Sequence, residues 1–335
     1  MATTYDIARV TGLNQSTVSR VLSGRGKVQA STARKVRAAC RKLGYVPNAA
    51  ARALRTRRTA ILAIHIPFGS ETVLADPFTP IFLAGVSRAA AGSGYRVILS
   101  YADPEHPEID FSELVKSGQA DGLIITSPMR ADPRVRTLVD QDIPCVLGRY
   151  VGRLGARMAS VDIDNRHTGY ISAKFLLSRG HRTIGLFTEH SDTLSALDFQ
   201  TGFRQALTEN KIRHADRLAR PIPVTFDAAF QAARELLNEA DPPTAMVADT
   251  ALTVFGVLEA VRRSGRDVLV LGIDSPLLRS LHPDLPRIQS PIEELGGRMT
   301  QVLVHILQTG EAGSASKMLF SRIVDEHGNL FTEET

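Results

Sequence analysis

The sequence predicts an α/β protein in which a small helical segment precedes a two-lobed body built on parallel sheets. Basic residues gather in the first sixth of the 335-residue chain, and short apolar runs alternate with amphipathic helical stretches in two successive rounds from position 60 onward. Strands that alternate with helices are typical of parallel sheets with right-handed crossovers. A chain of this length is expected to form two or three compact units, so each round is assigned to one lobe.

The charge of the N-terminal segment sets it apart from the body. Residues 3–58 contain thirteen Lys and Arg against a single acid, Asp6, which gives a net charge of +12. Of the 40 basic and 35 acidic residues of the chain, 27 and 34 remain elsewhere, a net charge of −7. Such a segment is suited to contact with a polyanion, although charge alone would fit a solvated basic tail equally well.

Helix signals within this segment favour a folded unit over a tail. Thr3 and Asp6 can form a capping box, and Gly12 breaks the helix that follows them. Asn14 then caps a second helix, which turns its apolar positions inward and its polar ones outward. The outward positions are Gln15, Ser16, Thr17, Ser19 and Arg20. Two short helices around a glycine turn predict a helix-turn-helix, and a third helix is expected over 31–43.

The segment resembles the lactose-repressor (LacI/GalR) family of bacterial transcription regulators. The matching motifs are Tyr5-Asp6-Ile7-Ala8, Gly12, residues 16–22, residues 43–48 and Ala51-Arg52-Ala53-Leu54-Arg55. The resemblance implies a lambda-repressor-like helix-turn-helix domain over 1–46, and a hinge helix with its linker over 47–58. It also implies a homodimeric regulator, most often a repressor, that binds near-palindromic operator DNA.

DNA contacts are expected from both parts of this segment. Arg20 can give a bidentate contact to guanine or a phosphate, and the resemblance implies that Leu54 wedges between base pairs in the minor groove. The alternative for Leu54 is simple packing against the body. The expected contact residues are Thr4, Tyr5, Gln15, Ser16, Thr17, Ser19, Arg20, Asn48, Ala51, Leu54 and Arg55.

The body is expected to contain two similar lobes. For the first lobe (59–156 plus 290–313) the apolar runs predict strands at 61–64, 97–99, 122–125 and 145–147, and helices near 81–91, 111–116, 134–140 and 292–308. For the second lobe (157–289 plus 314–330) they predict strands at 159–162, 183–187, 245–247, 268–271 and 317–324, and helices at 165–178, 197–209, 228–239 and 252–263. Residues 287–289 are expected to cross back to the first lobe.

Two lobes joined by several crossovers place a ligand cleft between them. The family resemblance continues through residues 161–165, 180–182, 272–274 and 289–296, and it implies a periplasmic-binding-protein-like body. A small-molecule effector, a sugar or related metabolite, is therefore expected in the cleft. The resemblance makes Asp274 an acceptor for effector hydroxyl groups, with a structural salt bridge as the alternative. The expected effector residues are Phe78, Thr79, Ser127, Arg149, Phe199, Asp249 and Asp274.

Three positions depart from the family pattern. Phe199 stands where the family usually has an effector-gripping arginine, Ser290 replaces a frequent glutamine, and Ala248-Asp249-Thr250 replaces the usual Ala-Asn-Asp. Loss of the guanidinium together with gain of an aromatic ring favours a neutral or cationic ligand that can stack over one that carries a carboxylate. A regulator that works without any effector is an alternative.

Other classes of protein find little support in the sequence. The nine histidines show no metal-ligand spacing, no nucleophile lies in a recognisable strand-turn-helix elbow, and 24–27 lacks the Ser or Thr of a phosphate loop, so no catalysis, metal or cofactor is expected. Without a signal-peptide core or an apolar run near the roughly 20 residues of a membrane helix, a cytoplasmic protein is expected. The rival interpretation is a solute-binding protein or enzyme on the same two-lobed body.

Overall fold

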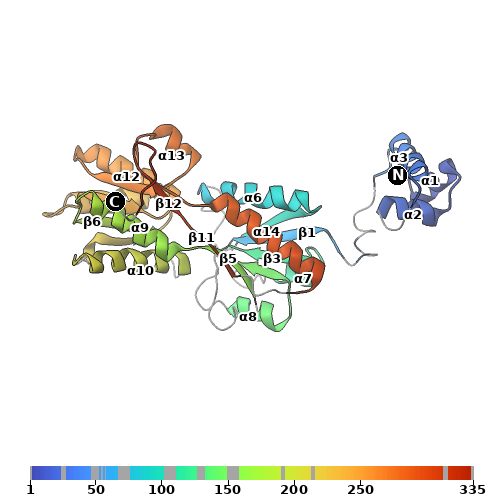
Figure 1. The fold of residues 1–335 in the computed structure, drawn as a ribbon, viewed down its shortest axis with the longest axis horizontal. Coiled ribbons are helices and arrows are strands. Elements are labelled where there is room, and N and C mark those ends of the chain that lie inside the picture. Colours follow the sequence, from blue (N-terminus) through green and yellow to red (C-terminus); the bar gives the residue numbers. More distant parts are fainter. Residues whose placement is uncertain are drawn as a thin grey trace. The chain divides into compact units, whose positions relative to one another are not determined.

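The computed structural model describes residues 2–23, 28–46, 53, 56, 58–66, 76–101, 111–126, 133–148, 158–189, 193–212, 216–311 and 316–332 (Figure 1). The chain divides into two compact units, Met1–Thr59 and Ala60–Thr335. The predicted fold class, a helix-turn-helix followed by a two-lobed α/β body with parallel sheets, is confirmed. No helix among the described residues is long and apolar enough to span a membrane.

Residues 2–23 and 28–46 of the N-terminal unit form three helices, α1 (Thr4–Thr11), α2 (Gln15–Ser23) and α3 (Ala30–Lys42). The predicted capping box is present, because the backbone N–H of Asp6 donates to the hydroxyl of Thr3 and the backbone N–H of Thr3 donates to the Asp6 carboxylate. Gly12 ends α1 in the left-handed conformation at φ 64°, which glycine adopts without steric cost. The core that joins the helices consists of Ile7, Val18, Val36 and Ala39.

The first lobe of the body is a wholly parallel six-stranded sheet in the order β11-β5-β4-β3-β1-β2. Its strands are β1 (Ile61–Ile66), β2 (Arg96–Tyr101), β3 (Gly122–Ile125), β4 (Cys145–Leu147), β5 (Ala159–Ile163) and β11 (Ser316–Leu319). Its helices are α6 (Phe78–Gly92), α7 (Glu113–Lys116), α8 (Pro133–Asp140) and α14 (Ile292–Thr309).

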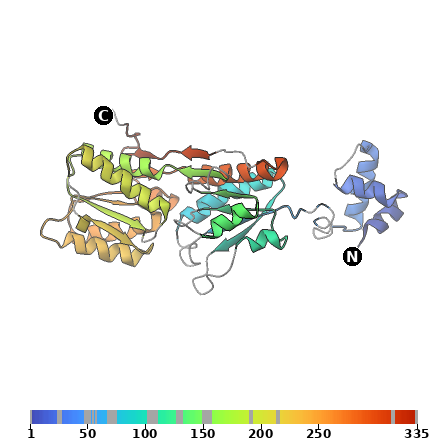
Figure 2. The ribbon, with the colours of Figure 1, turned by 90° about the horizontal axis from the view of Figure 1, so that it is seen from below.

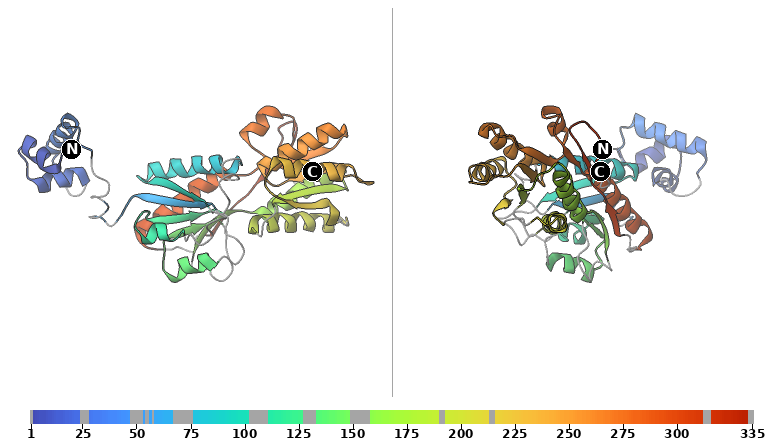
Figure 3. Two further views of the ribbon diagram at one scale, coloured as in Figure 1. Left: turned by 180° about the vertical axis from the view of Figure 1, so that it is seen from behind. Right: turned by 60° about the vertical axis from the view of Figure 1, so that its left-hand side comes forward.

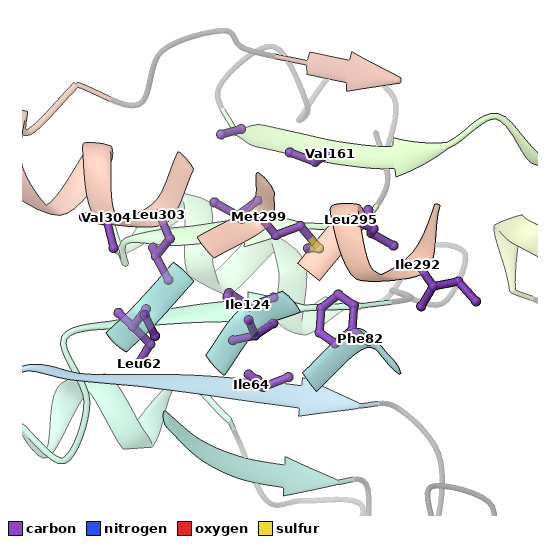
Figure 4. Packing of buried hydrophobic residues seen from close by; sticks show 14 of the residues in the cluster. Leu62, Ile64, Phe82, Ile124, Val161, Ile292, Leu295, Met299, Leu303 and Val304 are labelled. Carbon is purple, nitrogen blue, oxygen red and sulfur yellow. The ribbon is translucent and has the colours of Figure 1, made fainter. Parts of the chain in front are cut away.

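Alternate side chains of the strands point to opposite faces of this sheet, and each face carries its own core. On one face Leu62 and Ile64 pack with Phe82 of α6 and with Leu295, Met299 and Leu303 of α14 (Figure 4). On the other face Ala63 packs with Leu138 of α8. The sheet is therefore covered by helices on both sides (Figure 3).

The second lobe is a six-stranded sheet in the order β12-β10-β9-β8-β6-β7, in which only β10 and β12 pair antiparallel. Its strands are β6 (Ile184–Glu189), β7 (Ala219–Ile222), β8 (Ala245–Ala248), β9 (Leu269–Ile273), β10 (Arg287–Gln289) and β12 (Arg322–Val324). One face carries α9 (Asn165–Ser178) and α10 (Leu194–Glu209), and the other carries α11 (Phe226–Leu237) and α12 (Ala251–Ser264). A short helix, α13 (Pro276–Leu281), and a 3₁₀ turn, Asp216–Leu218, complete the lobe.

Two strand assignments made from the sequence need correction. The strand at 159–163, expected to open the second lobe, lies in the first sheet, where β5 pairs with β4 and β11 and its Val161 packs in the first core. The single strand expected at 317–324 is two strands: β11 belongs to the first sheet and β12 to the second (Figure 2). The chain therefore leaves the first lobe at Asp164 rather than at residue 157.

Three crossovers join the two lobes: Asp164 between β5 and α9, residues 290–291 between β10 and α14, and residues 320–321 between β11 and β12. A chain of hydroxyl groups connects them. The Thr168 hydroxyl donates to Ser321 Oγ at 2.9 Å, and Ser321 Oγ lies 3.0 Å from Ser290 Oγ. Because Thr168 and Ser290 also line the cavity described below, this chain connects the crossovers to the cleft.

Candidate functional site

The surface of α2 presents the polar side chains that the sequence assigned to DNA contact. Gln15, Ser16 and Arg20 are exposed, and Thr17 and Ser19 are half-buried. Tyr5, at the start of α1, is 72% exposed, so its ring and hydroxyl are accessible to a partner. The amide of Gln15 donates to the Thr4 hydroxyl at 3.4 Å and thereby joins the N-terminal ends of the two helices.

The acid of this segment is neutralised locally. Hydrogen bonds from Thr3 are the main cause that holds the pKa of Asp6 below its ordinary value, and the nearby Arg9 contributes through an ion pair at 3.4 Å. The carboxylate therefore stays ionised and bound to Thr3 and Arg9 at the N-terminus of α1, where the helix dipole favours a negative charge. The other expected DNA contacts, Asn48, Ala51, Leu54 and Arg55, lie outside the described residues.

A cavity of about 160 Å³ lies between the two lobes of the body. That volume is roughly ten times the about 10–15 Å³ that a single water molecule requires, so the cavity has room for a small organic ligand. Both lobes contribute, mainly through residues at or just beyond the carboxyl ends of parallel strands, the usual place for ligands in such sheets. Among the expected effector residues, those that line it are Phe78, Thr79, Phe199, Asp249 and Asp274.

The remaining expected effector residues, Ser127 and Arg149, lie outside the described part of the chain. The cavity is also lined by polar residues that were not among the expected effector residues, including Asp76, Thr126 and Glu189. Thr126 directly follows β3 and Glu189 ends β6, so their positions at strand ends were the available signal. Asp76 lies just before α6 and accepts a hydrogen bond from the backbone N–H of Phe78 at 2.7 Å.

The apolar part of the lining includes two aromatic rings. Phe78 stacks on Phe82 with ring centroids 5.7 Å apart and planes at 12°. Phe199 is only 3% exposed and belongs at the same time to the core of the second lobe. The departure from the family arginine at this position therefore replaces a charged side chain by a packed one, and the cavity wall is apolar there.

Three polar atoms in the cavity wall are closed to solvent and have no hydrogen-bond partner within the described structure: Asp249 Oδ1, Thr126 Oγ1 and Asp274 Oδ1, of which the last lies 3.6 Å from the charged Nε of Arg287. Other atoms of Asp249 keep some contact with solvent, so only its Oδ1 is shielded. Buried polar atoms are nearly always satisfied in folded proteins, and an exception at the wall of a cavity indicates a place where a ligand supplies the missing hydrogen bond.

The electrostatics of the cleft reflect several carboxyl groups in close proximity. Burial raises the pKa of Asp249 well above its ordinary value of 3.8, and the negative charges of Glu189 and Asp76 raise it further. Burial likewise raises the pKa of Asp76, again with a contribution from Glu189, although the hydrogen bond from Phe78 opposes this. Asp76 belongs to the first lobe and the other two to the second, so like charges face each other across the cleft.

Asp274 differs from these carboxyl groups because it is paired. Its carboxylate contacts the guanidinium of Arg279 and lies 3.6 Å from Nε of Arg287, and its side chain is only 7% exposed. Both arginines belong to the second lobe, so this is an ion-pair cluster within one lobe that also borders the cavity. The alternative that the sequence left open for Asp274, a structural salt bridge, is present, and a role in effector binding stays a prediction.

Chemistry other than binding has little support in the described structure. No group of three or more His, Cys, Asp and Glu side chains within it could hold a metal ion. Burial raises the pKa of Cys145 to about 12, so its thiol stays protonated and unreactive, and Cys40 is likewise a free thiol whose pKa burial raises.

A basic helix-turn-helix unit followed by a two-lobed body with a ligand-sized cavity defines a DNA-binding regulator that responds to a small molecule. The comparisons with known proteins agree. The family model described as "Bacterial regulatory proteins, lacI family" matches residues 3–48, and that described as "Periplasmic binding protein-like domain" matches residues 173–325. The chain belongs to the LacI family; it is a DNA-binding transcription regulator with an effector-binding body and not an enzyme.

Relatives match nearly the whole chain. The HTH-type transcriptional regulator CelR of Thermobifida fusca is 31% identical over 311 residues, which covers 91% of each chain, and the HTH-type transcriptional regulator RafR of Escherichia coli is 30% identical over 95% of each. Among solved structures, a CelR–cellobiose complex is 27% identical with a TM-score of 0.73 and covers 98% of this chain and 100% of that one. The lac repressor dimer bound to operator and an anti-inducer, 24% identical, has a TM-score of 0.82 over 97% of this chain and 98% of that one, and shows the shared fold.

Proposed function

We propose that this regulator is a homodimeric, cytoplasmic repressor that binds a near-palindromic operator, and that a saccharide in the interlobe cleft tunes its affinity for DNA. The observation that carries the effector part is the pair of unpartnered buried oxygens, Asp249 Oδ1 and Thr126 Oγ1, on opposite walls of the cavity. Such oxygens suit the hydroxyl groups of a sugar, each of which can donate one hydrogen bond.

Sequence-specific contact is assigned to the exposed face of α2. Gln15, Ser16 and Arg20 can reach base edges in the major groove, and Arg20 offers the bidentate geometry that guanine requires. Most of the other basic residues of the segment would contact phosphates, which add affinity but no sequence information. Leu54 is proposed as the minor-groove wedge from its place in the family motif.

Ligands bound in related structures support a saccharide. CelR was solved in complex with cellobiose, and a regulator of the same family from Enterococcus faecium was solved with bound ribose. The first of these aligns with the whole body of the present chain. In the present cleft, Phe78 and Phe199 add apolar surface on which the C–H face of a sugar ring can pack.

The mechanism is linkage between cleft closure and DNA binding. The three crossovers form the hinge between the lobes, and the hydroxyl chain through Ser321 connects them, so rotation of one lobe must affect all three together. A ligand that contacts both lobes favours the closed arrangement by its difference in affinity for the two states. The closed and open arrangements would hold the first lobes of the dimer at different angles and so order or separate the hinge segments.

The test is a fluorescence-anisotropy assay with the full chain, using DNA from upstream of its own gene and a shuffled duplex of the same length. The labelled native duplex should bind more tightly, with an affinity that falls steeply as salt rises, and a saccharide panel should contain a compound that changes this affinity. Equal binding to both duplexes, with saccharide binding intact, would instead favour the solute-carrier interpretation.

A further inference from the structure

The described residues that line the effector cavity carry charge of one sign only. Among the described residues that line it are five carboxylates and neither lysine nor arginine; the carboxylates are Asp76, Asp162, Glu189, Asp249 and Asp274. Burying carboxylates near one another is costly unless a positive charge or a proton compensates them. The cavity therefore constrains the charge of its ligand as well as its shape.

The five carboxylates differ in how far neighbouring groups compensate their negative charge. Asp274 has Arg279 and Arg287 beside it, and Asp162 accepts a hydrogen bond from the backbone N–H of Ile163 at 2.8 Å. Asp249 and Asp274 each have an oxygen that is closed to solvent and has no hydrogen-bond partner in the described structure, but among the described residues only Asp274 has arginines paired with it. Asp249 is therefore the carboxyl group that most needs compensation, which a proton supplies when no ligand is bound and a cationic ligand group could supply in its place.

The carboxylates near Asp249 lie on both lobes. Asp76 precedes α6 of the first lobe, whereas in the second lobe Glu189 ends β6 and Asp249 follows β8. All three interact electrostatically, since the negative charges of Asp76 and Glu189 both act on Asp249. Closing the cleft on a neutral ligand increases this repulsion, whereas a cation between the walls turns it into attraction.

An ammonium group satisfies the chemistry of this position. It supplies three hydrogen-bond donors and no acceptor, which matches a place that offers carboxylate oxygens and the free hydroxyl of Thr126. The apolar Phe199, where the family usually has an arginine, leaves no guanidinium there to compete with such a cation or to recruit an acidic ligand. The aromatic and hydroxyl-bearing remainder of the lining suits a sugar ring.

We propose that the effector is an amino sugar, a saccharide with a free protonated amine, whose ammonium group lies between Asp249 and Asp76 and draws the two lobes together. This inference rests on the proposed function, because it names the class of saccharide that the same cleft takes. Acidic sugars should not bind, because the carboxylates repel them, and neutral sugars should bind more weakly than amino sugars.

The test compares three disaccharides that share one skeleton and differ only at C2, by isothermal titration calorimetry on the full chain at about pH 6.5, where an amine is protonated. They are glucosaminyl-β-1,4-glucosamine, its N,N′-diacetyl derivative and cellobiose, with glucosamine, N-acetylglucosamine and glucose as the corresponding monosaccharides. The free amine should bind at least about tenfold more tightly than both neutral partners of its series.

Variants locate the charge. Asp249→Asn and Asp76→Asn should each weaken binding of the amine by about tenfold and should remove its advantage over the neutral partners of its series. The matched control is Asp142→Asn: Asp142 is exposed before β4 with φ 50°, a conformation that asparagine tolerates. Thermal melting of each variant verifies folding, and the comparison of ligands on the unmodified chain needs no variant.

Each outcome has a definite meaning. Equal or tighter binding of cellobiose or of the acetylated sugars overturns the amino-sugar inference and leaves a saccharide-responsive repressor standing. Failure of both free amines to bind overturns the inference as well. Loss of operator preference in the anisotropy assay, in contrast, overturns the proposed function independently of any sugar.

Discussion

Replacing Asp274 by asparagine should destabilise the body of the protein by about 3 kcal/mol, because it leaves a buried arginine without its counter-charge. The Asp274 and Arg287 side chains are 7% and 11% exposed, whereas Arg279, the other partner, is 48% exposed. Breaking a buried pair costs about 3–5 kcal/mol, whereas an exposed pair is worth at most about 1 kcal/mol. Arg287 is therefore the partner that decides the cost.

Two details place the expected value at the lower end of this range. The guanidinium of Arg287 also donates to the backbone oxygens of Pro283 and Leu285, at 2.8 and 3.1 Å, and would keep these bonds. Its Nε lies 3.6 Å from the Asp274 carboxylate, too far for a good hydrogen bond, so the pair acts mainly through charge.

The assay is urea unfolding followed by far-UV circular dichroism at fixed protein concentration, since dimerisation would make stability concentration-dependent. Arg279→Ala serves as the matched exposed-partner variant and should cost no more than about 1 kcal/mol. The double variant Asp274→Asn with Arg287→Met should recover part of the loss, because neither charge is then left alone. Asp274→Asn within about 0.5 kcal/mol of the unmodified protein would refute the reasoning and favour a purely effector-binding role.

Three further predictions concern DNA reading, packing and pH. Arg20→Ala should weaken operator binding by about 1–3 kcal/mol in the anisotropy assay, while Arg298→Ala, an exposed arginine on α14, should leave it unchanged. Gly85→Ala should lower the free energy of unfolding by about 1–3 kcal/mol in the same urea assay, because a Cβ there would overlap the backbone carbonyl of Glu293. The control Gly92→Ala has open space around it and should not change the free energy of unfolding. Equal effects of the two variants would contradict the packing argument. Burial and the neighbouring Glu189 and Asp76 raise the pKa of Asp249, so this carboxylate takes up a proton as pH falls toward 3.8. Amino-sugar affinity should then fall, and the ligand-free protein should gain stability, since the folded state binds that proton more tightly than the unfolded chain. An affinity that does not change with pH would contradict this prediction.

Local patterns in the sequence predicted the elements well. Thr3, Asp6 and Gly12 specify the first helix by hydrogen bonds and backbone conformation within a few residues, so the sequence is sufficient to place it. The apolar runs likewise gave most strands of the body. The edge strand β7 was missed because Arg220 and Pro221 interrupt its apolar character.

Assignments that depend on residues far apart in the sequence could not be predicted from local patterns. Nothing in residues 159–163 says whether they pair with β4 or open the next sheet, since parallel strands of either lobe look alike in sequence. In the cleft, too, only part of the site could be predicted. Positions at strand ends indicated Asp249 and Asp274, whereas the pairing of Asp274 with Arg287 and the unbonded oxygen of Thr126 depend on tertiary packing.

The position of α14 in the chain has a consequence for biosynthesis. Its Leu295, Met299 and Leu303 complete the core over Leu62 and Ile64, about 230 residues after those strand residues leave the ribosome (Figure 4). Until α14 is synthesised, that face of the first sheet is covered only in part, by α6, and such long-range closure slows folding and exposes nascent apolar surface. The helix-turn-helix unit, whose core is complete by residue 46, can fold during this interval, so we expect the nascent chain to depend on chaperones mainly while the body is being completed.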